Sequence, residues 1–425
     1  MAIRMFALNV GQGDSTLLRF SDGGCTLIDT HFVGEYATVW TEGVLPLLPT
    51  DDQGRKVLRH LIITHPHDDH IGGIGKLKES GVIVQNVWES GHRLYYPKDS
   101  NHPHYHAMLD LFAQVKRNGG TVRTLTAQSA PYTGPDGVVE WYCFSPSRYY
   151  IEAHKPSEQD IHTQCMVLKM VYGSQSVLFA GDSNAESWID RIVPFYGGES
   201  TEDVNNLLRS NILHASHHGS RTFFQREDGK DDELHEEAIA RISPDVTVIS
   251  VGEENVYGHP HSEALALYEE YSYHAEGVNP QVFETDDVGT IVITLYKDYY
   301  ELMPEEHFRV LRKGLFILTD KMWISPNPEP DEDGTYPMET SITFTLKGKP
   351  SSDQAIGRVI FDVQNNGLGD HQRVHNHYLG QNSESPTYRN RTAYHGTHNL
   401  FVCVKNTRGK IIAKFVHRVR VREEE

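Results

Sequence analysis

The hexapeptide His65-Pro66-His67-Asp68-Asp69-His70 follows directly after the apolar run 58–64, which is typical of a buried strand. It brings three imidazoles and two carboxylates together within six residues. Imidazole nitrogens and carboxylate oxygens are ligands that zinc, manganese and iron accept. The spacing allows the first two histidines to face one metal ion while Asp69 and His70 turn toward a second. We therefore predict a two-metal centre at the end of this strand, with a solvated polar loop as the alternative.

Strand-like and helix-like segments alternate along the chain on both sides of this hexapeptide. Predicted strands occupy residues 3–10, 16–20, 25–29, 58–64, 121–125, 166–172, 176–180 and 289–296. Helices are predicted over residues 36–48 and 106–118, and the segments 207–213, 236–242, 246–251 and 262–272 continue the alternation. Such alternation predicts a layered α/β fold, in which ligands bind where strands end.

A second, smaller domain is expected after a linker. Residues 325–334, Ser-Pro-Asn-Pro-Glu-Pro-Asp-Glu-Asp-Gly, are rich in proline and acidic residues, which is typical of linkers. The β-like runs that follow occupy residues 340–346, 358–363, 400–406 and 411–421. We therefore expect a first domain over 1–300, a connector over 301–335 and a β-rich domain over 336–425. Within the connector, 301–324 is either an interdomain helix or a last strand.

Charge is distributed unevenly between the two expected domains. Residues 336–425 contain 13 Lys and Arg against 8 Asp and Glu, a net charge of +5. Because the whole chain carries −19, the first 335 residues carry −24. The acidic first 335 residues argue against extensive binding of long nucleic-acid duplexes, since neutralising the phosphates needs Lys and Arg. The basic C-terminal domain is the better place for an anionic ligand.

The chain has no feature that predicts export or membrane insertion. Its N-terminus reads as a first strand without a basic start and long apolar run, and no stretch approaches the roughly 18 apolar residues of a membrane helix. Its four cysteines are widely spaced and form no Cys-x-x-Cys pair, which favours reduced thiols. We expect a cytoplasmic protein that does not engage a membrane, and oligomerisation stays possible.

Further motifs follow in the order typical of the metallo-β-lactamase superfamily, which the chain resembles through its His-x-His-x-Asp-His hexapeptide. They are Leu27-Ile28-Asp29-Thr30, Phe179-Ala180-Gly181-Asp182 and a late histidine. The resemblance implies an α/β fold, a four-layer αββα sandwich, and a metal-dependent hydrolase activity. It implies that Asp182 bridges two metal ions and that Asp29 supports the metal loop through hydrogen bonds. The implied cofactors are two divalent ions, Zn²⁺ for a histidine-rich set or Mn²⁺ because carboxylates contribute.

Three other motifs narrow the resemblance to the hydrolase domain of ComEC-type DNA-uptake proteins and their soluble relatives. They are Val10-Gly-Gln-Gly-Asp-Ser15, His217-His218-Gly219-Ser220 and Tyr257-Gly258-His259-Pro260. By this resemblance His217 is the late ligand, with His218 as the fallback if the register is off by one. His162 precedes the Gly-Asp hairpin, where ComEC-type relatives often carry Asn, so it either binds metal or lines the pocket. The complete set of candidate ligands is His65, His67, Asp69, His70, His162, Asp182 and His217.

Other polar residues are candidates for catalysis or for lining the pocket. His259 and His261 fall in a Gly-rich loop, where a histidine binds a phosphate oxygen, protonates a leaving group or caps the next helix. Asp14 either orients His65 or His67 or caps a tight glycine turn. The candidate catalytic residues are Asp69, His259 and Asp14. The candidate supporting residues are Asp29, His218, Ser220 and His261.

The C-terminal region resembles the sensor domain found beside adenylyl/guanylyl cyclase and nucleotidyltransferase (SMODS) modules in bacterial antiviral systems. The resemblance rests on Phe361-Asp-Val-Gln-Asn-Asn-Gly367 and on Arg391-Thr-Ala-Tyr-His-Gly-Thr-His398. Phe361 stands where Trp is common in that family, and Leu379-Gly380 lacks the usual Arg. The resemblance implies a domain that senses a nucleotide second messenger and gates the hydrolase, and the alternative is a β-sandwich with solvated charges. The implied anion-binding residues are Arg389, Arg391, His395 and His398.

These observations favour a metal-dependent phosphodiesterase or nuclease in antiviral defence, with a nucleic acid or nucleotide as substrate. Two divalent cations that share a water lower its pKa from about 16 to about 7, so that hydroxide forms near neutral pH. A small-molecule hydrolase, such as an esterase or lactonase, is the first alternative. The second is a ligand-sensing protein in which the hydrolase domain is mainly a scaffold.

Overall fold

The fold is taken from a computed structural model of the chain. It describes residues 2–94, 102–154, 160–226, 233–253, 255–272, 281–302, 322–331, 334–348, 356–365, 387–392, 396–406 and 411–422. No helix in these ranges is both long and apolar enough to cross a membrane.

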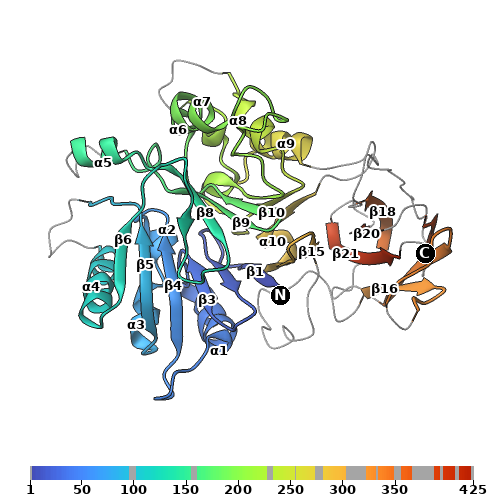
Figure 1. Ribbon diagram of the computed structural model, residues 1–425, viewed down its shortest axis with the longest axis horizontal. Coiled ribbons are helices and arrows are strands. Elements are labelled where there is room, and N and C mark those ends of the chain that lie inside the picture. The colour runs from blue at the N-terminus through green and yellow to red at the C-terminus, as the bar shows by residue number, and fades with distance from the viewer. Residues whose placement is uncertain are drawn as a thin grey trace.

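Two sheets face each other in the first domain (Figure 1). The first has eight strands in the order β15 (Tyr300–Leu302), β14 (Ile291–Leu295), β1 (Ile3–Ala7), β2 (Thr16–Arg19), β3 (Cys25–Ile28), β4 (Val57–Ile63), β5 (Ile83–Glu89) and β6 (Thr121–Thr124). The second has seven strands in the order β13 (Val282–Glu284), β12 (Val246–Ile249), β11 (Ile212–His214), β10 (Gln175–Phe179), β9 (Val167–Tyr172), β8 (Glu140–Ser145) and β7 (Tyr132–Thr133). Met5 and Ile62 of the first sheet share a core with Trp141 and Val177 of the second.

Short helices cover the outer faces of both sheets. The α-helices are α1 (Leu45–Leu47), α2 (Asp68–Ile71), α3 (Ile74–Glu79), α4 (Pro103–Arg117), α5 (Arg148–Ala153), α6 (Ala185–Ser187), α7 (Val193–Tyr196), α8 (Glu237–Ile242), α9 (Ser262–Tyr271) and α10 (Thr285–Val288). Leu77 of α3 and Leu111 of α4 pack on the outer face of the first sheet, and Ile239 of α8 and Leu267 of α9 pack on that of the second. The layers therefore run helix, sheet, sheet, helix, which confirms the predicted four-layer αββα sandwich.

Most predicted elements of this domain are confirmed, with two informative differences. The helix expected over 36–48 is broken into short turns: Gly34–Tyr36 (3₁₀), Val39–Val44 (π) and α1. The segment 207–213 contributes only Ile212–His214 to the sheet. Its earlier carbonyls at Leu207 and Arg209 accept hydrogen bonds from Lys169 Nζ, at 2.9 and 2.5 Å, instead of pairing with a strand.

The C-terminal region is a sandwich of two three-stranded sheets, as the expectation of a β-rich domain required. One sheet has the order β16 (Met322–Asn327), β17 (Ser341–Gly348) and β19 (Thr387–Arg391), and the other β18 (Ile356–Asn365), β20 (Gly396–Asn406) and β21 (Ile411–Val421). Ile342 and Phe344 of the first sheet pack with Phe361 and Val402 of the second.

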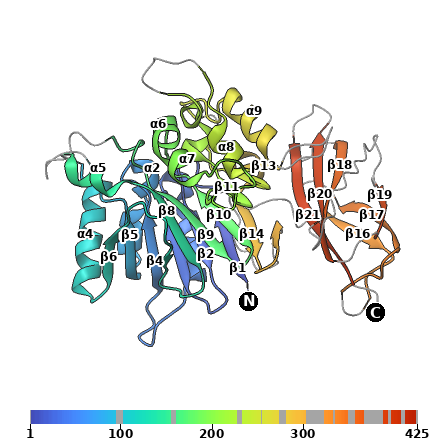
Figure 2. The same cartoon turned by 45° about the horizontal axis from the view of Figure 1, so that its top comes forward.

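The ends of the expected connector 301–335 lie within the two domains. Strand β15 continues to Leu302 in the first sheet, and β16 begins at Met322 in the C-terminal sandwich because Ile324 is buried there. The two domains touch, since β21 contacts both α10 and β15. Figure 2 shows the C-terminal sandwich beside the larger domain, with β21 on the side nearest to it.

Candidate metal centre

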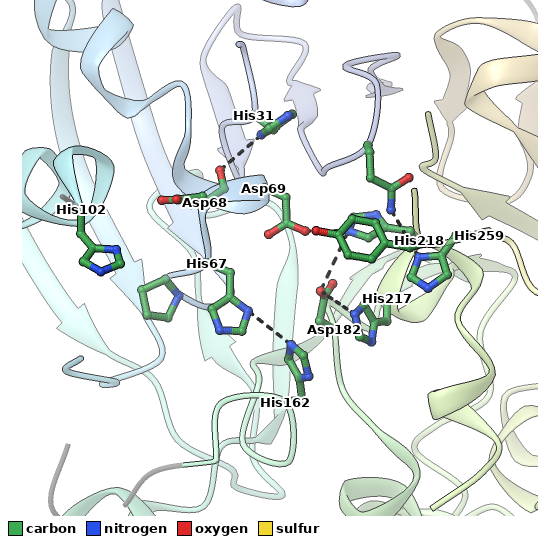
Figure 3. A pocket seen from close by; sticks show the side chains of 13 residues that line it. His31, His67, Asp68, Asp69, His102, His162, Asp182, His217, His218 and His259 are labelled. Carbon is green, nitrogen blue, oxygen red and sulfur yellow. Dashed lines mark hydrogen bonds and ion pairs between the residues drawn. The ribbon is translucent and has the colours of Figure 1, made fainter. Parts of the chain in front are cut away.

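The candidate metal ligands come together where strands of both sheets end (Figure 3). The hexapeptide follows β4, Asp182 follows β10, and the pair His217-His218 follows β11. Strands β10 and β11 are parallel, so their carboxyl ends lie at the same edge. A pocket of about 550 Å³ opens over this edge, and Asp69, Asp182, His218 and His259 are among the residues that line it.

A first group of three imidazoles lies on one side of the pocket floor. His65 Nε2 lies 3.1 Å from His67 Nδ1, which lies 3.2 Å from His162 Nε2. The three ligand atoms lie within 4.8 Å of one another. Burial lowers the pKa of His65 and of His67, so both rings are neutral, the state in which imidazole binds a metal. His162 therefore joins the hexapeptide histidines, although the sequence left its role open.

A second group consists of Asp69, His70, Asp182 and His218, whose ligand atoms also lie within 4.8 Å of one another. His218 Nε2 lies 3.3 Å from Asp69 Oδ2 and 3.9 Å from Asp182 Oδ2. Asp182 reaches both groups, because it lies 3.0 Å from His70 Nε2 and 3.7 Å from His65 Nε2. This position between the two groups is the one that the resemblance implied for a bridging carboxylate.

The chemistry of these residues fits divalent cations. Asp182 Oδ1 and His70 Nε2 are buried and lie 3.0 Å from each other, and neither makes a hydrogen bond to another residue that the structure describes. Burial alone would raise the pKa of Asp182, but the neighbouring imidazoles, His70 foremost, hold it well below its usual range. A buried, ionised carboxylate that faces uncommitted imidazole nitrogens is costly without a cation, and a metal ion satisfies both partners.

Asp29 anchors the metal loop from below. Its Oδ1 accepts a hydrogen bond from the Thr64 backbone N–H at 2.9 Å, and its Oδ2 accepts one from Thr64 Oγ1 at 2.6 Å. Oδ2 also lies 2.7 Å from His70 Nδ1. Nδ1 donates to Asp29, so Nε2 of His70 is the ring atom that faces the metal group. Burial alone would lower the pKa of His70, but Asp182 and Asp29 raise it well above its usual value, so a bound metal ion would displace a proton from Nε2. A carboxylate behind a ligating histidine fixes its tautomer and raises its basicity.

The two late histidines lie on one unusual turn but serve different groups. His217 and His218 both adopt left-handed backbone conformations, with φ of 49° and 55°, which non-glycine residues rarely take. His218 Nδ1 donates to the Ser250 carbonyl at 2.9 Å, so its Nε2 is free to face Asp69 and Asp182. His217 instead lies with His162 and Asp182. The sequence favoured His217 as the late ligand with His218 as the fallback, and the structure brings both to Asp182, with His217 Nε2 at 3.7 Å and His218 Nε2 at 3.9 Å from its Oδ2.

Electrostatics separates these two histidines further. Burial alone would lower the pKa of His218, but Asp182 and Asp69 raise it to about 9. Burial lowers the pKa of His217 to about 4. The carboxylates therefore favour a positive charge on or beside His218, whereas the ring of His217 is neutral, like those of His65 and His67.

Substituting the two late histidines separately is expected to give different metal contents. His218→Ala removes a ligand of the second group and should lower the metal bound after dialysis from about two ions to about one per chain. His217→Ala leaves both groups with at least three ligands and should retain about two. Elemental analysis by mass spectrometry measures the metal content, with His104→Ala as the control that should match the wild type, because His104 lies on α4 outside the pocket and both groups. The reverse pattern would assign the late ligand to His217.

Asp14 lies behind the second ligand group rather than beside His65 or His67, the two histidines that it was expected to orient. Its carboxylate lies 3.9 Å from His70 Nδ1 and 3.8 Å from His218 Nδ1. Its expected catalytic role stays a prediction, and its carboxylate is buried and is not among the groups that line the pocket. The reason is the chain path: the Asp14 backbone N–H donates to the Asp69 carbonyl, which places the carboxylate behind the second group.

Of the other candidate residues, one lines the pocket and two stabilise the loop beside it. His259 lines the pocket, and its Nδ1 lies 3.3 Å from Gln12 Nε2. His261 accepts a hydrogen bond from the Arg221 backbone N–H at 3.1 Å, and Ser220 accepts one from Thr222 N–H at 3.3 Å. Neither residue lines the pocket, so both stabilise the turn that carries the late histidines.

Sequence reasoning gave no role to six residues that line the pocket: Gln12, His31, Pro66, Asp68, His102 and Tyr257. Gln12 and Tyr257 belong to motifs quoted above, so the signal was present although no role was assigned to either. His31 and His102 are single histidines outside any motif, and only the folded chain brings them to the site.

The expected anion site of the C-terminal domain is not a single cluster among the described residues. Arg389 and Arg391 are exposed on β19, where Arg389 Nε donates to Ser341 Oγ at 2.9 Å and Arg391 pairs with Glu339. His398 is buried on β20 of the other sheet, apart from these two arginines. His395 lies outside the described residues.

The comparison with protein families agrees with this fold and site. Residues 8–139 match the model of the metallo-beta-lactamase superfamily. This match places a metallo-beta-lactamase superfamily domain in the first part of the chain, and the His/Asp groups agree with the metal-dependent hydrolase class that the sequence predicted.

Two curated proteins are similar to the chain over most of its first domain. ComE operon protein 3 of Bacillus subtilis is 27% identical over 294 residues, which are 67% of this chain and 32% of that protein. Recombination protein 2 of Haemophilus influenzae is 22% identical over 299 residues, 69% of this chain and 29% of that protein. The matched region thus spans about a third of the length of these relatives.

Solved structures give weaker similarities. A mutant of CmlA beta-hydroxylase aligns with a TM-score of 0.38 at 17% identity, covering 69% of this chain and 53% of that one. Fibronectin(III)-like modules of Clostridium thermocellum CbhA align with a TM-score of 0.18 at 14% identity, covering 24% of this chain and 99% of that one.

Proposed function

We propose that this protein is a metal-dependent phosphodiesterase that cleaves a nucleic acid or a nucleotide. The observation that carries the proposal is the position of Asp182 between two ligand groups at the floor of an open pocket. Two adjacent divalent cations are typical of enzymes that hydrolyse phosphoryl groups. The printed name of the H. influenzae relative refers to recombination, a process of nucleic acids, which favours this substrate class over lactams or lactones.

The ligand groups indicate how the cations would be held. His65, His67 and His162 with Asp182 form a histidine-rich set that suits Zn²⁺, whereas Asp69 and Asp182 add oxygen ligands that Mn²⁺ also accepts. When bound, such ions supply a water of lowered pKa and neutralise charge on a phosphoryl oxygen.

His259 is the best candidate for binding the phosphate or the leaving group. Gln12 Oε1 accepts a hydrogen bond from the Gly252 backbone N–H at 3.2 Å, which fixes the orientation of its amide. The amide nitrogen of Gln12 therefore donates to His259 Nδ1, and the ring proton lies on Nε2. Burial lowers the pKa of His259 to about 4, so the neutral ring offers Nε2–H as a donor to a phosphate oxygen.

The proposal includes control of the hydrolase site by the C-terminal domain. The resemblance of this domain implies that it senses a nucleotide second messenger in antiviral defence. One chain of contacts supports the control. Strand β21 touches α10, whose first residue, Thr285, bonds both the N–H and the carbonyl of Val251 at 2.9 and 3.0 Å. Val251 precedes the loop that carries His259. A shift of the C-terminal sandwich can therefore reach the pocket through a single packed helix.

The test is a substrate panel with the purified full chain and Mn²⁺ or Zn²⁺. Single-stranded DNA, duplex DNA, RNA and cyclic dinucleotides are compared with an ester, a thioester and a lactone. Cleavage of a phosphodiester that is lost in Asp69→Ala/His70→Ala supports the proposal. The control is Asp190→Ala, an exposed carboxylate that does not line the pocket and belongs to neither group, and it should keep its activity. Metal-dependent cleavage of the ester or lactone alone would replace the phosphodiesterase with a small-molecule hydrolase.

A further inference from the structure

An exposed aromatic ring stands at the rim of the metal pocket. Tyr257 lines the pocket, yet its residue is 64% exposed. Its ring stacks on that of His259, with centroids 5.7 Å apart and planes at 26°. His259 stacks in turn on His218, at 6.3 Å and 28°. A row of three rings therefore leads from the second ligand group to solvent.

The loop that carries Tyr257 is internally braced. Asn255 Nδ2 donates to the carbonyls of Gly252 and His259, at 2.9 and 2.6 Å. Asn255 Oδ1 accepts from the His259 backbone N–H at 2.9 Å. These three bonds fix the backbone near Tyr257, and the contact with His259 orients its ring before any ligand arrives. A preorganised ring loses little conformational entropy when a ligand stacks on it.

The charge of the protein makes such a ring useful. The chain carries −19, so a substrate with a phosphate backbone gains little from long-range attraction outside the metal pocket. Stacking on an aromatic side chain supplies affinity that does not depend on charge or on base sequence, because every base has a π-face. A base within a duplex is covered on both faces by its neighbours, so only an unpaired base is available to stack.

We propose that Tyr257 binds an unpaired nucleobase next to the scissile phosphate and so makes the site selective for single-stranded substrates. This inference rests on the proposed phosphodiesterase function. Tyr257 acts through stacking on the base and takes no part in the bond-breaking step.

The test compares wild type with Tyr257→Ala and Tyr257→Phe on two single-stranded oligonucleotides, one intact and one abasic beside the cleaved bond. For the intact strand, Tyr257→Ala should raise KM by about 5- to 100-fold with kcat little changed, and Tyr257→Phe should retain the wild-type KM. For the abasic strand the three proteins should have the same KM. The matched control is Val256→Ala, because Val256 is a 92% exposed neighbour without a ring.

A binding measurement separates this inference from the proposed function. Fluorescence anisotropy gives the Kd of the intact strand for Asp182→Asn and for Asp182→Asn/Tyr257→Ala. A Kd raised by about 5- to 100-fold in the double variant supports stacking even if the wild type cleaves no phosphodiester, and that result would count against the phosphodiesterase alone. Equal Kd values, or an equal rise of KM on the abasic strand, would overturn the role of Tyr257.

Discussion

Asp182→Asn is expected to lower the rate of hydrolysis by about a thousand-fold or more, which corresponds to about 4 kcal/mol of activation free energy. The carboxylate lies 3.0 Å from His70 and 3.7 Å from His65, so it contributes to both ligand groups at once. The amide that replaces it is uncharged, and one side-chain oxygen cannot balance two divalent cations. Steady-state kinetics on the substrate found by the panel, together with the metal content after dialysis, measures the effect.

The control is Asp190→Asn, in which an exposed carboxylate that pairs with Arg226 is changed in the same way. It should retain wild-type rate and metal content. An Asp182→Asn protein that keeps two metal ions and at least a tenth of the wild-type rate would show that Asp182 does not bridge the groups.

The largest expected effect on stability comes from Trp141→Ala, which should lower the free energy of unfolding by about 3–5 kcal/mol. Trp141 is fully buried between the two sheets of the first domain. Its ring centroid lies 6.0 Å from that of Trp88 on the opposite sheet and 6.4 Å from that of Phe179 on the same sheet. Its Nε1 makes no hydrogen bond to a described residue, so the cost is one of packing and of the cavity left behind.

Urea unfolding followed by circular dichroism measures this change. Val138→Ala is the control, since Val138 lies nearby in the sequence but is 45% exposed, and its effect should stay within about 0.5 kcal/mol. A loss below about 1 kcal/mol for Trp141→Ala would mean that the two sheets do not depend on this ring for their packing.

Local sequence determined the core of the fold and the first ligands. Most of the run 58–64 lies in strand β4, because the apolar residues 61–63 at its end suit a strand buried on both faces, although Arg59 and His60 interrupt the apolar pattern before them. The hairpin of β9 and β10 follows from two such runs around Gly173, whose φ of 65° the turn requires. The hexapeptide could be recognised as a metal-binding motif because its candidate ligands are neighbours in the sequence, so the fold is not needed to see them together.

Tertiary structure decided which distant residues complete the site. Asp69 and His218 are 149 positions apart, and nothing in the local sequence distinguishes His218 from His217. Two left-handed residues in succession turn the imidazoles to different sides, and a bond to Ser250 orients only one of them. The partners of Asp14 and the rim position of Tyr257 depend in the same way on loops that meet only after the sheets have packed. Sequence patterns report the backbone periodicity and chemistry of neighbours, whereas distances between loops are set by how the two sheets pack against each other.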